Sequence, residues 1–114
     1  MTRRTGRGPA SFLALAGLAA GLLACVHVVP QELVDARLAF ERAEDGPARR
    51  YTPLELDIAE EALDRAQATF QASGDTAVVR DQATRARRMT ELVDAMARIA
   101  RRFAEAQRHE AAAP

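Results

Sequence analysis

Residues 52–75 have the sequence TPLELDIAEEALDRAQATFQASGD, which contains a helix start, an apolar stripe and a helix stop. Thr52 and Glu55 are spaced as a capping box, in which each side chain accepts from a backbone N–H of the first turn, and Pro53 suits the first helical position. Apolar residues then recur at steps of three and four: Leu56, Ala59, Leu63, Ala66 and Phe70. Gly74 is the expected C-cap and Asp75 the next N-cap. This pattern predicts an amphipathic helix that ends in a tight turn.

Similar patterns flank this segment on both sides. Residues 31–45 carry a narrow stripe at steps of three and four, and Gly46-Pro47 ends it; its members are Leu33, Ala36, Phe40 and Ala43. From about residue 76 to about residue 108 there is no Gly or Pro, and a seam at alternating steps of three and four favours a long coiled-coil helix. The expected seam consists of Val79, Gln82, Ala86, Met89, Val93, Met96, Ala100, Phe103 and Gln107.

The predicted fold class is all-α: an antiparallel three-helix bundle, or a helical hairpin with a long third helix, over residues 31–109, followed by a disordered tail at 110–114. The third helix is longer than the second. Phe103 should therefore overhang the start of the second helix by roughly 15 Å, at about 1.5 Å per residue. Either the connection 46–52 folds over Ile99 and Phe103, or these side chains are available to a partner. Tyr51, in that connection, is favoured as a packing residue at the helix start over a recognition aromatic.

Residues 1–25 have the pattern of a bacterial export signal. Arg3, Arg4 and Arg7 precede an apolar run from Phe12 to Ala24. The run is shorter than the approximately 20 apolar residues that a membrane-spanning helix needs. It ends in Leu22-Leu23-Ala24-Cys25, which resembles the lipobox of bacterial lipoproteins, the motif that directs lipidation of a cysteine.

That resemblance implies a signal peptide at 1–24, cleavage between Ala24 and Cys25, and a lipidated Cys25 at the head of a tether that extends to Pro30. Two or more acyl chains on one residue would anchor the protein stably in a lipid bilayer. Val26 follows the cysteine. In enterobacterial lipoproteins an Asp there retains the protein in the inner membrane, so Val26 favours the periplasmic side of the outer membrane.

The composition restricts the function classes. Three of the 16 Lys and Arg residues lie in the leader, which leaves 13 against 16 acidic residues, and this net negative charge argues against nucleic acid as a partner. The one cysteine is expected to be acylated. His27 and His109 lie far apart in the sequence, so we expect no catalytic residues, no metal site and no cofactor. An acidic cluster on the second helix, Asp57, Glu60, Glu61 and Asp64, is better interpreted as a solvated face than as a cation site.

A family resemblance supports this organisation. Gly46, the segment Tyr51-Thr52-Pro53-Leu54-Glu55-Leu56 and the pair Gly74-Asp75 match the break, the second-helix start and the turn of an uncharacterised family of bacterial lipoproteins. The similarity covers most of residues 30–105. Some members of that family continue into an OmpA-like domain that binds peptidoglycan. We expect no such domain in this chain, so peptidoglycan is a possible but unsupported partner, and the resemblance implies no catalytic residues.

Together these features predict a membrane-anchored periplasmic lipoprotein that acts as a non-catalytic structural or interaction module, with a protein partner or a second copy of itself. The alternative is a periplasmic chaperone-like or adaptor module that binds exported polypeptides through the apolar end of the third helix. In both cases the expected binding surface is the overhang, with an apolar centre and a rim of arginines: Met96, Ile99, Phe103, Gln107, Arg98, Arg101 and Arg102.

Overall fold

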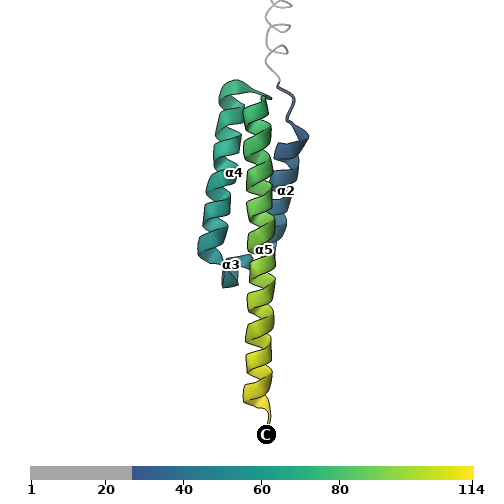
Figure 1. The fold of residues 1–114 in the computed structure, drawn as a ribbon, viewed down its shortest axis with the longest axis vertical. Coiled ribbons are helices and arrows are strands. Elements are labelled where there is room, and N and C mark those ends of the chain that lie inside the picture. Colours follow the sequence, from purple (N-terminus) through teal and green to yellow (C-terminus); the bar gives the residue numbers. More distant parts are fainter. Residues whose placement is uncertain (1–26) are drawn as a thin grey trace, which may run out of the picture.

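The computed structural model describes residues 27–114, and the regular structure in this range is entirely helical (Figure 1). The helices are α2 (Gln31–Asp45), α3 (Ala48–Tyr51), α4 (Pro53–Ser73) and α5 (Ala77–Ala112). The predictions of an all-helical fold and a long last helix are therefore confirmed. α5 continues to Ala112, into the stretch for which the sequence suggested a disordered tail.

α5 lies in the middle of the fold and packs against both α4 and α2 (Figure 1). α4 runs antiparallel to α5, as the tight turn between them requires, whereas α2 runs in the same direction as α5. Contacts between α2 and α4 are far fewer than those that either makes with α5. The C-terminal part of α5 extends well past α3 and the start of α4. One helix thus provides most of the packing surface for the other three.

The buried face of α5 is made mostly of small side chains. Its buried residues follow steps of four and three: Val79, Ala83, Ala86, Thr90, Val93 and Ala97. The predicted seam is therefore right at Val79, Ala86 and Val93, which are buried, and Gln82 and Ala100 are partly buried. It is wrong at the exposed residues Met89, Met96, Phe103 and Gln107. The reason is that α5 has a neighbour on each side, so both can come close only where α5 carries small residues. Thr90 fits because its hydroxyl donates to the Ala86 carbonyl, 2.8 Å away.

The start of α4 differs from the predicted capping box. Thr52 is the N-cap residue and Pro53 is the first helical residue, as predicted, but the Thr52 side chain makes no capping hydrogen bond. Its hydroxyl instead donates to the carbonyl of Ala48, 3.3 Å away. The cause is α3, a single helical turn that the sequence analysis did not predict. Thr52 ends that turn, since its backbone N–H also donates to the Ala48 carbonyl. Its hydroxyl is therefore bonded to α3 and does not cap α4.

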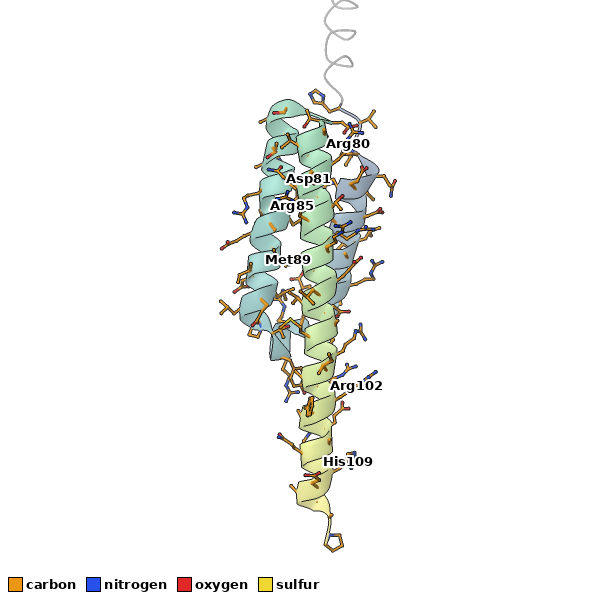
Figure 2. All side chains as sticks on the ribbon, in the orientation of Figure 1. Arg80, Asp81, Arg85, Met89, Arg102 and His109 are labelled. Carbon is orange, nitrogen blue, oxygen red and sulfur yellow. The ribbon has the colours of Figure 1, made fainter. Side chains whose placement is uncertain are left out.

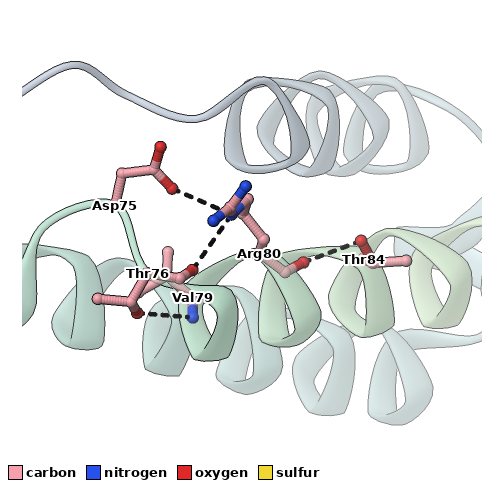
Figure 3. Close-up of polar contacts among 5 residues, drawn as sticks. All are labelled: Asp75, Thr76, Val79, Arg80 and Thr84. Carbon is pink, nitrogen blue, oxygen red and sulfur yellow. Dashed lines mark hydrogen bonds and ion pairs between the residues drawn. The ribbon is translucent and has the colours of Figure 1, made fainter.

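The turn between α4 and α5 is built around Gly74. This residue has a φ of +70°, and its N–H donates to the carbonyl of Phe70 over 2.8 Å, so it is the C-cap that the sequence predicted. Thr76, and not the predicted Asp75, caps α5: its Oγ1 accepts from the N–H of Val79 over 3.3 Å (Figure 3). The Asp75 carboxylate instead pairs with Nε of Arg80, 3.3 Å away. The predicted cap was therefore one residue too early.

Candidate interaction surface

The C-terminal part of α5 carries large apolar side chains that nothing in residues 27–114 covers. The last buried residue of α5 is Ala97, so we define the overhang as residues 98–112. Within it, Ile99 is 55% exposed and Phe103 is 68% exposed. Ile99 and Phe103 line a shallow hollow together with Arg102 and Ala106. The structure therefore has an apolar surface at the end where the sequence analysis expected one.

The connection between α2 and α4 does not cover these residues. It forms α3, which packs against α5 and buries Ala48 completely. Tyr51 is half buried and packs against the core, as expected of a packing residue, and the Arg50 guanidinium lies 5.4 Å from the centre of its ring. Of the two outcomes that the sequence left open, the structure has the one in which Ile99 and Phe103 are accessible.

The exposed apolar surface is larger than the overhang. It continues up α5 through three residues that lie beside α4, and we define the whole set as the outer stripe: Met89, Leu92, Met96, Ile99, Phe103 and Ala106. Leu92 is 61% exposed, although it lies within the packed part of the helix. The steps of three, four, three, four and three could have revealed this stripe from the sequence alone. The predicted seam places Met89 in the core and does not include Leu92.

α4 adds to the same surface. Leu54 and Ile58, one turn apart on α4, are both exposed. Farther along the helix pair, a groove runs between α4 and α5, and Met89 of the outer stripe forms one of its walls; the groove residues are Ala62, Arg65, Gln82, Arg85 and Met89. Figure 2 shows Arg85, Met89 and Arg102 in succession along α5. The outer stripe is thus continuous with an open groove between the two helices.

Arginines border the overhang. Arg98 is held by Asp94 within the same helix, with Nε 2.9 Å from Oδ2. Arg101 approaches Glu105 at 4.0 Å, whereas Arg102 makes no ion pair with any residue between 27 and 114. Gln107 is exposed near the end of α5. Of the predicted rim residues, only Arg102 lines the hollow beside Phe103.

The outer face of α4 is acidic. Asp57, Glu60, Glu61 and Asp64 are all exposed, and Arg65 is the sole basic residue of that helix. Among residues 27–114, no group of three or more acidic, histidine or cysteine side chains is arranged to hold a metal ion. The body of the molecule therefore presents an acidic helix beside the groove, while the overhang is basic.

The candidate lipidation site lies elsewhere. Cys25, the cleavage position after Ala24 and the lipobox residues Leu22 and Leu23 lie outside the described residues. The described chain begins at His27, whose ring lies edge-on to Phe70, with ring centres 6.4 Å apart. None of the helices between residues 27 and 114 is both long and apolar enough to cross a membrane.

A comparison with protein families identifies the family of this chain. The family model described as Domain of unknown function (DUF4398) matches residues 31–113. The chain belongs to this family. No similar curated protein and no similar solved structure is found.

The DUF4398 match begins at the first residue of α2 and ends one residue after α5. It therefore covers all four helices. It includes the whole outer stripe and the groove beside it. Cys25 lies before the matched range. The candidate interaction surface is therefore part of the family domain.

Proposed function

We propose that this DUF4398 protein is a lipoprotein of the bacterial cell envelope, anchored through acylated Cys25, whose helical domain works by contact with another polypeptide. The arrangement proposed is a bundle of three main helices behind a signal peptide. The outer stripe is the observation that carries the contact role. Monomeric proteins rarely expose large contiguous apolar patches, and such patches mark binding sites. The proposal assigns the protein no catalytic role.

The position of the tether supports the anchoring part of this proposal. His27 packs beside Phe70, and a Cβ on Gly74 would lie 3.2 Å from its Nδ1. Cys25 is two residues earlier, which allows a reach of about 7 Å from His27. Acylation of Cys25 would thus hold the α4–α5 turn close to the lipid headgroups. The overhang would then start at the opposite end of the domain, and α5 is long enough to extend about 50 Å.

The anchor is tested by measuring the intact mass of the protein purified from its own membranes. The expected mature chain begins at Cys25 and carries acyl chains, and Cys25→Ala should abolish both the cleavage and the added mass. Fractionation of the inner and outer membranes then tests the expected outer-membrane location. An unlipidated chain cleaved elsewhere, or one that keeps residues 1–24, contradicts the proposal.

A second function is a chaperone-like or adaptor activity toward exported polypeptides. The observation that favours it is the exposure of Leu92, Ile99 and Phe103 in one continuous stripe. Such a surface would bind unfolded segments through their apolar side chains, and it would also bind an environment-sensitive dye. If this function is correct, the lipidated protein should suppress the aggregation of an unfolded model substrate, and Phe103→Asp should weaken that suppression. Association of the protein with itself through the same stripe would contradict it.

A further inference from the structure

We propose that the outer stripe of α5 binds the outer stripe of a second copy of this chain, as an antiparallel coiled coil. This inference deepens the proposed contact function, since it names the partner of the same surface. The steps of three and four along the stripe are the a and d positions of a heptad repeat. They form a second seam on a helix whose first seam, from Val79 to Ala97, is already buried. A helix with two such seams has one for its own domain and one for another helix.

One alignment of the two helices places every large apolar side chain of the stripe against another apolar residue. In antiparallel coiled coils an a position faces a d position of the partner helix. The alignment that pairs Met96 with Ile99 of the second copy also pairs Leu92 with Phe103 and Met89 with Ala106. At each end of this contact a large side chain, Met89, meets a small one, Ala106, which suits the interdigitation of close-packed interfaces.

The charges along the stripe favour the same alignment. Beyond the pair of Met89 and Ala106, the next facing positions of the two helices are Arg85 and Glu110 of the second copy. Because the dimer is symmetric, opposite charges meet in this way at both ends of the contact. A parallel alignment would instead place each Arg85 against the other Arg85, and each Glu110 against the other Glu110. Like charges at facing positions are destabilising. Both Arg85 and Glu110 are exposed in the single chain. Arg85 there pairs with Asp81 of its own helix, with Nε 3.2 Å from Oδ2, and such an exposed pair costs little to exchange for Glu110 of the second copy.

The lengths of the helices fit as well. In this alignment, residues 98–112 of one copy lie beside residues 83–97 of the other. That region of α5 borders the groove with α4, where Ala62 and Arg65 form the second wall. Each overhang thus lies along the groove of the other copy, over a total overlap of about four heptads, enough for a stable coiled coil.

If Cys25 is acylated as proposed, this dimer has a consequence for its orientation. The α4–α5 turns, which hold the tethers, lie at opposite ends of the dimer and about 60 Å apart, at 1.5 Å per residue along two overlapping copies of α5. Both anchors can enter one bilayer only if the dimer lies along the membrane surface. This part of the inference rests on the proposed function, whereas the pairing of the two α5 helices does not.

The alignment is tested by disulfide cross-linking of the full chain in membranes. Leu92→Cys and Phe103→Cys are made in separate copies that carry different tags, and the two copies are produced together and oxidised. A cross-link between the differently tagged copies is expected. Either variant alone should not cross-link, because two copies of residue 92 would lie about 16 Å apart along the axis. Cross-linking of each variant to itself would show a parallel pair, and cross-linking to a different protein or to nothing would also overturn the proposal.

The unaltered chain is the control, since its one cysteine is Cys25. If Cys25 is not acylated, the unaltered chain can cross-link through that thiol, and the lipoprotein proposal fails. The mixed pair of variants still reports the dimer, because a cross-link that requires both variants does not come from Cys25. Failure of the anchor and failure of the dimer are therefore distinguishable.

A second test measures the mass of the full chain in detergent by light scattering. Phe103→Asp places a carboxylate against Leu92 of the second copy and should weaken association on the order of 100-fold, giving a monomer. Val78→Asp is the matched control: Val78 is 59% exposed on the same line of α5, but it lies beyond the end of the antiparallel partner. A dimer for Val78→Asp and a monomer for Phe103→Asp are expected. A monomeric unaltered chain, or equal effects of both substitutions, would contradict the pairing.

Discussion

The two faces of α5 differ in a way that reverses the usual relation between side-chain size and burial. The buried face has Ala83, Ala86 and Ala97 between its larger residues, whereas the exposed face has Leu92 and Phe103. Hydrophobicity does not decide which face is the core. What decides it is that α2 and α4 both approach α5, and small side chains allow both to come close. The larger apolar residues remain outside, where one further helix has room for them.

The sharpest test of this comparison uses two adjacent residues. Val93 is 4% exposed and Leu92 is 61% exposed. Val93→Asp buries an unpaired carboxylate and should lower the free energy of unfolding by about 3 kcal/mol or more, which lowers the melting temperature by about 15 °C. Leu92→Asp leaves its carboxylate in water and should change the stability of the monomer by about 0.5 kcal/mol or less. Thermal unfolding followed by circular dichroism, at a concentration where the chain is monomeric, measures both. Similar losses for the two variants would show that the faces are wrongly assigned.

A second test asks whether the buried face needs its small residues. Ala86 is 1% exposed in the core, where Leu56 and Leu63 of α4 belong to the same cluster. Ala86→Leu adds three carbon atoms to a packed space and should cost about 1–3 kcal/mol of stability, although leucine is a good helix former.

Ala95→Leu is the matched control, because Ala95 is exposed on the same helix. It should change the free energy of unfolding by less than about 0.5 kcal/mol. Urea denaturation of the two variants gives the comparison. If Ala86→Leu were neutral or stabilising, the buried face would contain space, and its small residues would need another explanation.

The difference between the two faces also shows what the sequence can and cannot predict. The stripes of α2 and α4 were predicted correctly, because each of these helices contacts the core along one line, through residues such as Leu33 and Leu63. On α5 two apolar lines lie side by side, and periodicity alone does not show which one is buried. The predicted seam combined members of both lines, since Met89 and Val93 fit the same alternation. Only the packing of two neighbours on α5 separates them.

The short-range signals had a similar limit. Gly74 was predicted correctly because a turn with positive φ has one strong residue preference. Thr52 and Asp75 have the right chemistry for capping, but Thr52 bonds to α3 and Asp75 pairs with Arg80. The overhang was expected from helix lengths alone, and the structure adds its extension to Leu92. Cys25 stays a prediction, since it lies outside the described residues.

A third test concerns the turn that sets the angle at which α4 meets the buried face. Gly74→Ala forces an alanine into a φ of +70°, and its Cβ would lie 3.2 Å from Nδ1 of His27. The expected loss of stability is about 1–2 kcal/mol, mostly from the backbone. Adding His27→Ala removes the second contribution and should restore only a small part of the loss. Full recovery in the double variant would mean that the contact with His27, and not the backbone conformation, requires glycine here.

The smallest expected effect concerns the residue at which α5 begins, since this start determines which residues fall on each face. Thr76→Ala removes the side chain that accepts from the Val79 N–H, and it should cost about 1 kcal/mol of stability. Asp75→Ala removes only an exposed ion pair with Arg80 and should cost about 0.5 kcal/mol or less. If Asp75 were the cap, as the sequence suggested, the two losses would be reversed. Urea denaturation of both variants decides between the two caps. Raising the salt concentration should reduce only the effect of Asp75→Ala, because screening weakens an exposed ion pair but not a neutral capping hydrogen bond.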